Sequence, residues 1–357
     1  MAPSEGSGVD LLEARIAAIP DHARAFLASA WPDLERLPPG QGVVCTGLGS
    51  SEAAARYAVA LLGRRGRRPV RFAPVSEFYG DPPFDPEGQV LVVFSQGLSP
   101  NSRIPLRRRR EFARTVLVTS ATVEGQRRRG RADRADFLGT FAEEGGMVWR
   151  HPPEDEFTIL PRVIGPFCAL LAAHRLARGL EGSGIPEPPG EPLWRDLPAG
   201  GPREAAETDA WAREILEGCD FYFTGGLSGY AGNLACKAME CVLRPPPRSY
   251  DVFDYAHGPF QADRAAPRHR WIFAGSSEAE ADLLERLLPL FRRAGPCRVL
   301  RSVLPAPFEI FGFELLLDRI VARAAVLAEV DLRDWPGKGE DGAAYDLARP
   351  FSGGTDP

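Results

Sequence analysis

Strand-like and helix-like segments alternate along this chain, and the alternation runs through twice. In the first run, apolar segments lie at 42–47, 69–74, 89–95, 115–120 and 147–150, with helical patterns at 9–30, 51–63, 102–114 and 160–177. In the second run, strands are expected at 221–226, 248–253, 270–275 and 297–302, with helices at 205–218, 229–243, 277–293 and 311–328. Alternating strands and helices favour parallel sheets with helices on both faces. We therefore predict an α/β protein made of two tandem three-layer α/β/α units.

The two runs also share a turn that joins a strand to a helix rich in small residues. The turn GLGSSEAAARYA (47–58) is similar to GGLSGYAGNLACKA (225–238), which indicates an internal duplication. A length of 357 residues allows two domains, each with its own core. The predicted parts are an N-terminal helical segment (1–36), a first domain (37–185), a linker (186–204), a second domain (205–335) and a C-terminal tail (336–357).

Composition limits the partners that this chain is expected to have. A net charge of −5 gives no general attraction to nucleic acid or to anionic membranes. The basic runs Arg107–Arg110 and Arg127–Arg129 lack interleaved aromatic residues, so we interpret them as solvated surface. The six scattered cysteines form no metal-binding pattern and fit free thiols in a reducing compartment. We expect a cytoplasmic protein with no signal peptide, membrane span, metal or cofactor.

Two hydroxyl-rich loops follow neighbouring predicted strands of the first half. The first contains Gly49, Ser50 and Ser51. The second, SQGLSPNS, contains Ser95, Gln96, Ser99 and Ser102. Glycine lets the backbone approach an anion, and the N-terminus of the following helix offers N–H groups. Simple capping of the two helices by these serines is the alternative explanation. Neither loop has the pattern of a nucleotide-binding fingerprint, so nucleotide hydrolysis and hydride transfer are poorly supported.

The second half carries a candidate proton-transfer site. Lys237 and Glu240 lie three residues apart on a predicted helix, so both side chains are expected on one face. His257 follows in the turn sequence Ala-His-Gly-Pro. The chain has only two lysines, Lys237 and Lys338, and a buried lysine has a pKa that shifts readily. An exposed ion pair with a loop histidine is the alternative to this catalytic interpretation.

These motifs resemble those of the sugar isomerase (SIS) domain family, and most closely the isomerase half of glucosamine-6-phosphate synthase and related tandem-SIS proteins. The likeness runs from about residue 30 to 349. It includes CTGLGSSEAA, Ser76 to Phe78, the loop 95–102, the helix with Lys237 and Glu240 followed by His257-Gly-Pro, and YDLARP near the end.

The resemblance implies a role for each matched residue. Glu240 would move a proton between C1 and C2 of an open-chain sugar phosphate, and Lys237 would stabilise the developing oxyanion. His257 would open the sugar ring from the partner subunit, which implies a homodimer. The loop 95–102 would hold the phosphate, with Gly49, Ser50 and Ser51 nearby, and Thr158 would line the same pocket.

Three departures from the family pattern bear on the reaction. No glutaminase domain precedes the first unit, so amination from glutamine within this chain is not expected. The family's imine-forming lysine falls on Arg349, which cannot form an imine, although Lys338 is an alternative. Gly97 stands where a serine is expected in a loop that is one residue short, so another anion, facing Arg349 or Arg103, is a further alternative to phosphate.

We therefore predict an isomerase of sugar phosphates or amino-sugar phosphates that works through an enediol or enolamine. Aldose–ketose isomerisation, deaminating isomerisation and deglycation of a fructosamine phosphate remain open, and Arg349 favours the first and third. The alternative is a non-catalytic regulatory protein that binds a sugar phosphate. A third hypothesis is a lyase or transferase that uses the same enediol chemistry.

Overall fold

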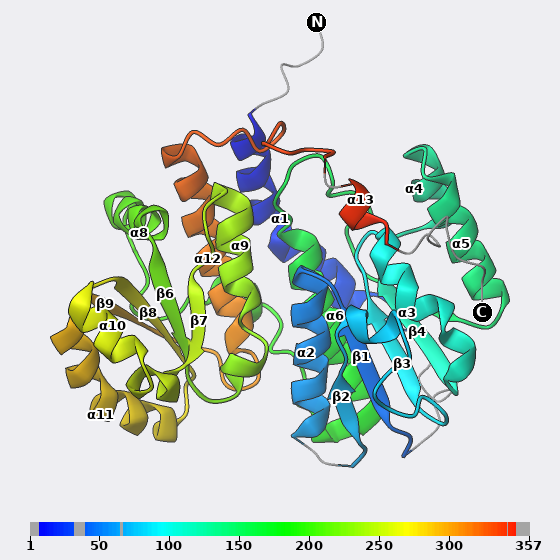
Figure 1. The fold of residues 1–357 in the computed structure, drawn as a ribbon, viewed down its shortest axis with the longest axis horizontal. Helices are drawn as coiled ribbons and strands as arrows, with labels where there is room; N and C mark the ends of the chain where they lie inside the picture. The colour runs from blue at the N-terminus through cyan, green and yellow to red at the C-terminus, as the bar shows by residue number, and fades with distance from the viewer. Residues whose placement is uncertain (1–6, 32–39, 65–66, 341, 348–357) are drawn as a thin grey trace, which may run out of the picture. The chain divides into compact units, whose positions relative to one another are not determined.

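The computed structural model describes residues 7–31, 40–64, 67–340 and 342–347, and its ribbon is drawn in Figure 1. The chain divides into two compact units, each built on one sheet. The β1–β5 unit comprises the described parts of residues 28–156, 168–186 and 334–357. The β6–β9 unit comprises the described parts of residues 1–27, 157–167 and 187–333. Each unit is therefore assembled from segments that are distant in sequence.

The sheet of the β1–β5 unit is wholly parallel, with the strand order β2-β1-β3-β4-β5. Its strands are β1 (Val43–Gly47), β2 (Val70–Phe72), β3 (Val90–Phe94), β4 (Arg114–Thr119) and β5 (Met147–Arg150). All five residues of β1 and all five of β3 are buried. This explains why they read as continuous apolar runs, because a central parallel strand is covered on both faces.

This unit has six helices among the residues that the structure describes. They are α2 (Ser50–Gly63), α3 (Arg103–Arg107), α4 (Val123–Arg128), α5 (Ala132–Glu143), α6 (Ile164–Glu181) and α13 (Gly342–Tyr345). Leu91 and Val93 of β3 belong to one core cluster with Leu106 of α3 and Leu138 of α5. Successive strand residues point to opposite faces, so the alternate residues of β3 point to the other face of the sheet.

The sheet of the β6–β9 unit is also parallel and has the order β7-β6-β8-β9. Its strands are β6 (Cys219–Phe223), β7 (Arg248–Asp251), β8 (His269–Ala274) and β9 (Cys297–Arg301). The order second-first-third-fourth is the same as that of the first four strands of the other sheet. The predicted α/β class with parallel sheets is confirmed, whereas the internal duplication stays a prediction.

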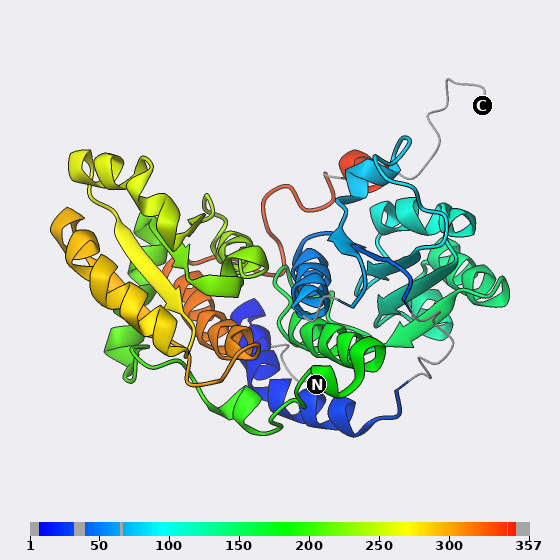
Figure 2. The same cartoon turned by 90° about the horizontal axis from the view of Figure 1, so that it is seen from below.

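Helices cover both faces of the second sheet, as the two views in Figures 1 and 2 show for α11 and α12. One face packs Tyr222 and Ile272 against Leu284 and Phe291 of α11. On the other face, the ring centroid of Phe273 lies 5.2 Å from that of Phe313 on α12. The helices of this unit are α1 (Gly8–Ala28), α7 (Pro192–Arg195), α8 (Ala205–Glu217), α9 (Asn233–Val242), α10 (Pro259–Ala265), α11 (Glu278–Ala294) and α12 (Glu309–Leu327).

Some predicted elements differ in extent from the structure. The helix expected at 102–114 is only α3 followed by a 3-10 turn at Arg109–Glu111. The helix expected from 160 begins at Ile164. The predicted linker contains α7, and Ala199 forms an antiparallel bridge to Arg301.

Among the described residues, no helix is both long and apolar enough to cross a bilayer.

Candidate functional site

The first predicted anion loop follows β1 and has a backbone that only glycine fits at two positions. A Cβ atom on Gly47 would lie 2.5 Å from the carbonyl oxygen of Ser51, and Gly49 has a φ of +57°. Gly49 is the N-cap of α2, so the serines after it are the first helical residues and do not cap the helix. Ser50 is half-buried and Ser51 is buried. The turn therefore brings the N-terminus of α2 to the carboxyl end of β1.

The second predicted anion loop follows β3 and is held together by its own hydroxyl groups. Ser95 donates a hydrogen bond of 2.9 Å to Oγ of Ser102, and Ser102 donates one of 2.6 Å to the carbonyl oxygen of Ser99. Leu98 adopts a left-handed conformation with a φ of +51°, which is uncommon for a residue with a side chain. Two of the predicted hydroxyl donors thus shape the loop, while the hydroxyl group of Ser99 is half-buried.

Gln96 is fixed from the opposite side of this loop. Its Nε2 donates a hydrogen bond of 3.0 Å to Oε2 of Glu156, a fully buried carboxylate that the sequence did not single out. The main-chain carbonyl oxygen of Gln96 accepts hydrogen bonds from the hydroxyl groups of Thr119 and Ser120 at the end of β4. Gln96 is itself buried, so its contribution to a ligand site would be to hold the loop in shape.

The structure brings the two loops to one edge of the sheet. Strands β1 and β3 are parallel neighbours, and Gly47 is paired with Phe94. The strand order reverses between them, because β2 lies on the far side of β1 and β4 lies on the far side of β3. Ligands of open α/β sheets bind at the carboxyl ends of strands where the order reverses. Residues 49–51 and 95–102 therefore form the candidate binding edge of the β1–β5 unit.

The C-terminal segment lies against the second loop. Asn101 Nδ2 donates a 2.9 Å hydrogen bond to the carbonyl oxygen of Ala344, and the N–H of Leu347 donates one of 2.7 Å to Asn101 Oδ1. Arg103 is buried, and its guanidinium group forms an ion pair of 3.0 Å with Asp133 and a longer one of 4.0 Å with Asp346. The charge of Arg103 is therefore already compensated. Arg349 lies outside the described residues, and Lys338 stands 5.0 Å from the ring centroid of Trp335.

In the β6–β9 unit, the structure places Lys237 and Glu240 in different surroundings. Lys237 is buried and its Nζ forms ion pairs with Glu314 and, at 2.7 Å, with Asp318 of α12. Glu240 is exposed. The two side chains were expected on one helical face, and the structure places one of them in the interior and the other at the surface. Lys237 belongs with the buried Leu234 and Cys241, three and four residues away, and the boundary between buried and exposed faces of α9 falls before position 240.

The pKa values of these two groups move upward for different reasons. Burial alone would lower the pKa of Lys237, but the charges of Asp318 and Glu314 outweigh it and raise the pKa. Lys237 is therefore a fixed ammonium group, unlike the tunable amine expected from the sequence. Partial desolvation raises the pKa of Glu240, and the charges of Arg162 and Lys237 oppose this rise.

His257 is exposed in a turn with a defined backbone. Asp251 accepts a hydrogen bond of 2.9 Å from the N–H of Phe253, and the N–H of His257 donates one of 2.8 Å to the carbonyl oxygen of Asp254. Gly258 has a φ of +126°, a value that side chains rarely tolerate, and Pro259 begins α10. The turn therefore presents the imidazole to solvent.

Thr158 forms a hydrogen bond in the structure, and Arg162, four residues further along, is a residue that sequence reasoning missed. Thr158 is exposed, and its hydroxyl oxygen accepts a hydrogen bond of 2.7 Å from Arg15 of α1. Arg162, whose charge acts on Glu240, was not selected from the sequence. The sequence could have drawn attention to Arg162, because it is the only charged residue between 157 and 173.

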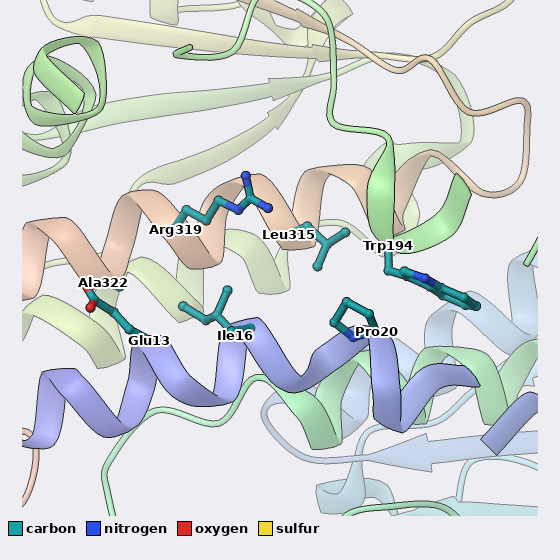
Figure 3. A pocket seen from close by; sticks show the side chains of 8 residues that line it. Glu13, Ile16, Pro20, Trp194, Leu315, Arg319 and Ala322 are labelled. Carbon is teal, nitrogen blue, oxygen red and sulfur yellow. The ribbon is translucent and has the colours of Figure 1, made fainter. Parts of the chain in front are cut away.

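A separate pocket of about 330 Å³ lies in the β6–β9 unit, as Figure 3 shows. Its lining comes from α1, α7 and α12: Glu13, Ile16, Ala17, Pro20, Trp194, Leu315, Arg319 and Ala322. None of the predicted site residues that the structure describes is among them. Within the described parts of the chain, no group of three or more His, Cys, Asp or Glu side chains is arranged to hold a metal ion.

Comparison with known proteins identifies the fold. The C-terminal domain of glucosamine-fructose-6-phosphate aminotransferase from Francisella tularensis superposes with a TM-score of 0.70 at 15% identity, over 94% of this chain and all of that one. The chain has the sugar isomerase (SIS) fold. No family model and no curated protein sequence matches the chain.

Two further structures with this SIS fold are similar over most of their length. Glucosamine-6-phosphate deaminase from Thermotoga maritima has a TM-score of 0.61 at 15% identity, over 91% of this chain and 97% of that one. Tagatose-6-phosphate ketose/aldose isomerase from Escherichia coli has a TM-score of 0.60 at 13% identity, over 91% of this chain and 90% of that one. The structural similarity establishes the arrangement of the helices and strands. Because the sequence identities are low, the reaction has to be argued from the site residues.

Proposed function

We propose that the protein is an isomerase of sugar phosphates that transfers a proton between C1 and C2 through an enediol. The observation that carries the proposal is the exposed carboxylate of Glu240, whose pKa is raised, on α9 of a chain with the SIS fold. The candidate binding edge of the β1–β5 unit supports an anionic substrate, since the N-terminus of α2 and the half-buried Ser50 and Ser99 lie at it. The named activities of the deaminase and the ketose/aldose isomerase support the substrate class.

The proposed reaction balances without a cofactor. With an aldose phosphate, the Glu240 carboxylate takes the proton from C2, and the C–H electron pair forms the C1–C2 double bond. The carbonyl electrons move to the oxygen on C1, which gives an enediolate. Glu240 returns the proton to C1, a proton passes from the oxygen on C2 to the oxygen on C1, and the ketose results.

His257 is proposed to open the sugar ring before this transfer, and to do so from a partner subunit. Its exposure on a turn that two hydrogen bonds hold supports that role, because an imidazole that serves a second chain must be accessible on the first. We do not assign Lys237 to the substrate, because Glu314 and Asp318 hold its ammonium group. Its proposed role is to position α9 against α12.

The test separates catalysis from binding by the substitution Glu240→Gln. We expect it to lower turnover by a factor of about 10² to 10⁴ while affinity for the sugar phosphate changes little. Exchange of the C1 or C2 proton with solvent deuterium, across a panel of hexose and pentose phosphates, measures turnover. Calorimetry measures binding. Binding without exchange in the wild type would contradict the proposal and favour a sugar-phosphate-binding regulator.

A further inference from the structure

The pocket of the β6–β9 unit is a groove between helices α1 and α12, and Trp194 of α7 stands at one end of it (Figure 3). The lining residues of α1 recur every three or four positions from Glu13 to Pro20, so they share one helical face. Those seven residues span about 10 Å along the helix axis. The volume of about 330 Å³ lies near the lower end of the range of about 300–1,000 Å³ that ligand pockets occupy. The groove therefore suits a small molecule.

The end of the groove at α7 is apolar. Figure 3 places Trp194, Pro20 and Leu315 together there, and the side chains of Trp194 and Leu315 are buried in the unit. Ile16 continues this wall along α1. An apolar group of a ligand would leave water on entering this end, and an aromatic ring could pack against the indole.

The rest of the groove carries two groups of opposite charge. Glu13 of α1 and Arg319 of α12 line it, and both are exposed. No ion pair joins them to each other or to another residue in the part of the chain that the structure describes. Arg323, one turn beyond Arg319, differs, because its Nη2 donates a hydrogen bond of 2.9 Å to Asp209. Glu13 and Arg319 are therefore the charges that remain available to a ligand in this groove.

We propose that this groove binds an apolar α-amino acid in its zwitterionic form. The ligand carboxylate pairs with the guanidinium group of Arg319, whose planar fork can form two parallel hydrogen bonds. The ligand ammonium group pairs with the carboxylate of Glu13, and an aromatic or branched side chain points toward Trp194. This site goes beyond the proposed isomerase and does not depend on it, because no residue assigned to proton transfer lines the groove.

The two charges favour a zwitterion over simpler amphiphiles. A monocarboxylate that reached Arg319 would leave Glu13 without a partner and close to a like charge. An amine that reached Glu13 would do the same to Arg319. A ligand with both groups satisfies both residues, and the opposite charges select against molecules that have only one.

The first experiment measures binding by calorimetry with L-phenylalanine, 3-phenylpropionate and 2-phenylethylamine. L-phenylalanine should bind more tightly than either analogue. Arg319→Gln should weaken L-phenylalanine about tenfold without weakening the amine, and Glu13→Gln should weaken it about tenfold without weakening the carboxylate. The control Arg286→Gln, an exposed arginine of α11 in the same unit, should change none of the affinities. Absence of L-phenylalanine binding, or equal affinity of L-phenylalanine and 3-phenylpropionate, would overturn the proposal.

The second experiment locates the ligand. Ala17 lines the groove at an exposed position, so Ala17→Trp should fill the groove without disturbing the core. L-phenylalanine should shift the methyl NMR signals of Ile16 and Leu315 in the wild type and should no longer bind to Ala17→Trp. Unaltered binding to Ala17→Trp would place the ligand elsewhere and overturn the proposal. So would sedimentation that shows a dimer of the wild type which Ala17→Trp dissociates, because a second copy of the chain would then cover the groove.

Discussion

At the scale of single residues, Lys237 has the spacing to Glu240 that the motif predicts, but its ammonium group forms buried ion pairs with Glu314 and Asp318. The ammonium group lies among buried acids of α12, where each carboxylate without its cation would be costly. Lys237→Met should therefore lower the free energy of unfolding by about 3–5 kcal/mol. Urea unfolding at pH 7 measures this loss.

The control for this prediction removes the stranded charges as well. The triple variant Lys237→Met, Glu314→Gln and Asp318→Asn should regain much of the lost stability, since it leaves no unpaired buried charge. A single variant that unfolds like the wild type but loses all proton exchange would contradict a structural role. That result would indicate that Lys237 acts on the substrate.

At the scale of elements, Glu280 joins α11 to the ends of two strands of its sheet. Its carboxylate accepts hydrogen bonds from Thr224 Oγ1 at 2.6 Å, Gly275 N at 3.2 Å and Ser277 Oγ at 2.6 Å. Desolvation raises the pKa of Glu280, but the hydrogen bonds from Ser277 and Thr224 outweigh it, and the net shift is downward. This one side chain thus caps a helix and ties β6 to β8.

The lowered pKa fixes the sign of the pH dependence. A carboxyl group with a folded pKa below its unfolded value contributes stability above the unfolded pKa, about 4.3, and loses it as pH falls through the folded pKa. Glu280→Ala should lower the free energy of unfolding by about 1–2 kcal/mol at pH 7, and by less once the wild-type carboxyl group is protonated. Denaturant unfolding at pH 7 and at acidic pH measures both. Glu278→Ala, in the exposed first turn of α11, is the control, and a pH-independent difference would contradict the argument.

The elements also show what could be predicted from the sequence. Strand β3 was predictable because a buried parallel strand is a continuous apolar run between polar loops. Helices α4 and α5 were not predicted, since only Ala135, Leu138 and Phe141 of the twelve residues of α5 are buried. The burial of Lys237 depends on Glu314, 77 residues further along the chain, which no local pattern reveals.

At the scale of the whole molecule, the proposed site needs a second copy of the chain, because His257 is proposed to act on a sugar held by its partner. Glu240→Gln and His257→Ala should each be inactive alone. Refolded together in equal amounts, they form mixed dimers in which one of the two sites has both natural residues. Random pairing leaves about a quarter of all sites intact, so about a quarter of wild-type proton exchange should return. If His257 instead serves its own chain, every site in the mixture lacks one of the two residues and no activity returns, and sedimentation of the mixture shows whether dimers formed at all.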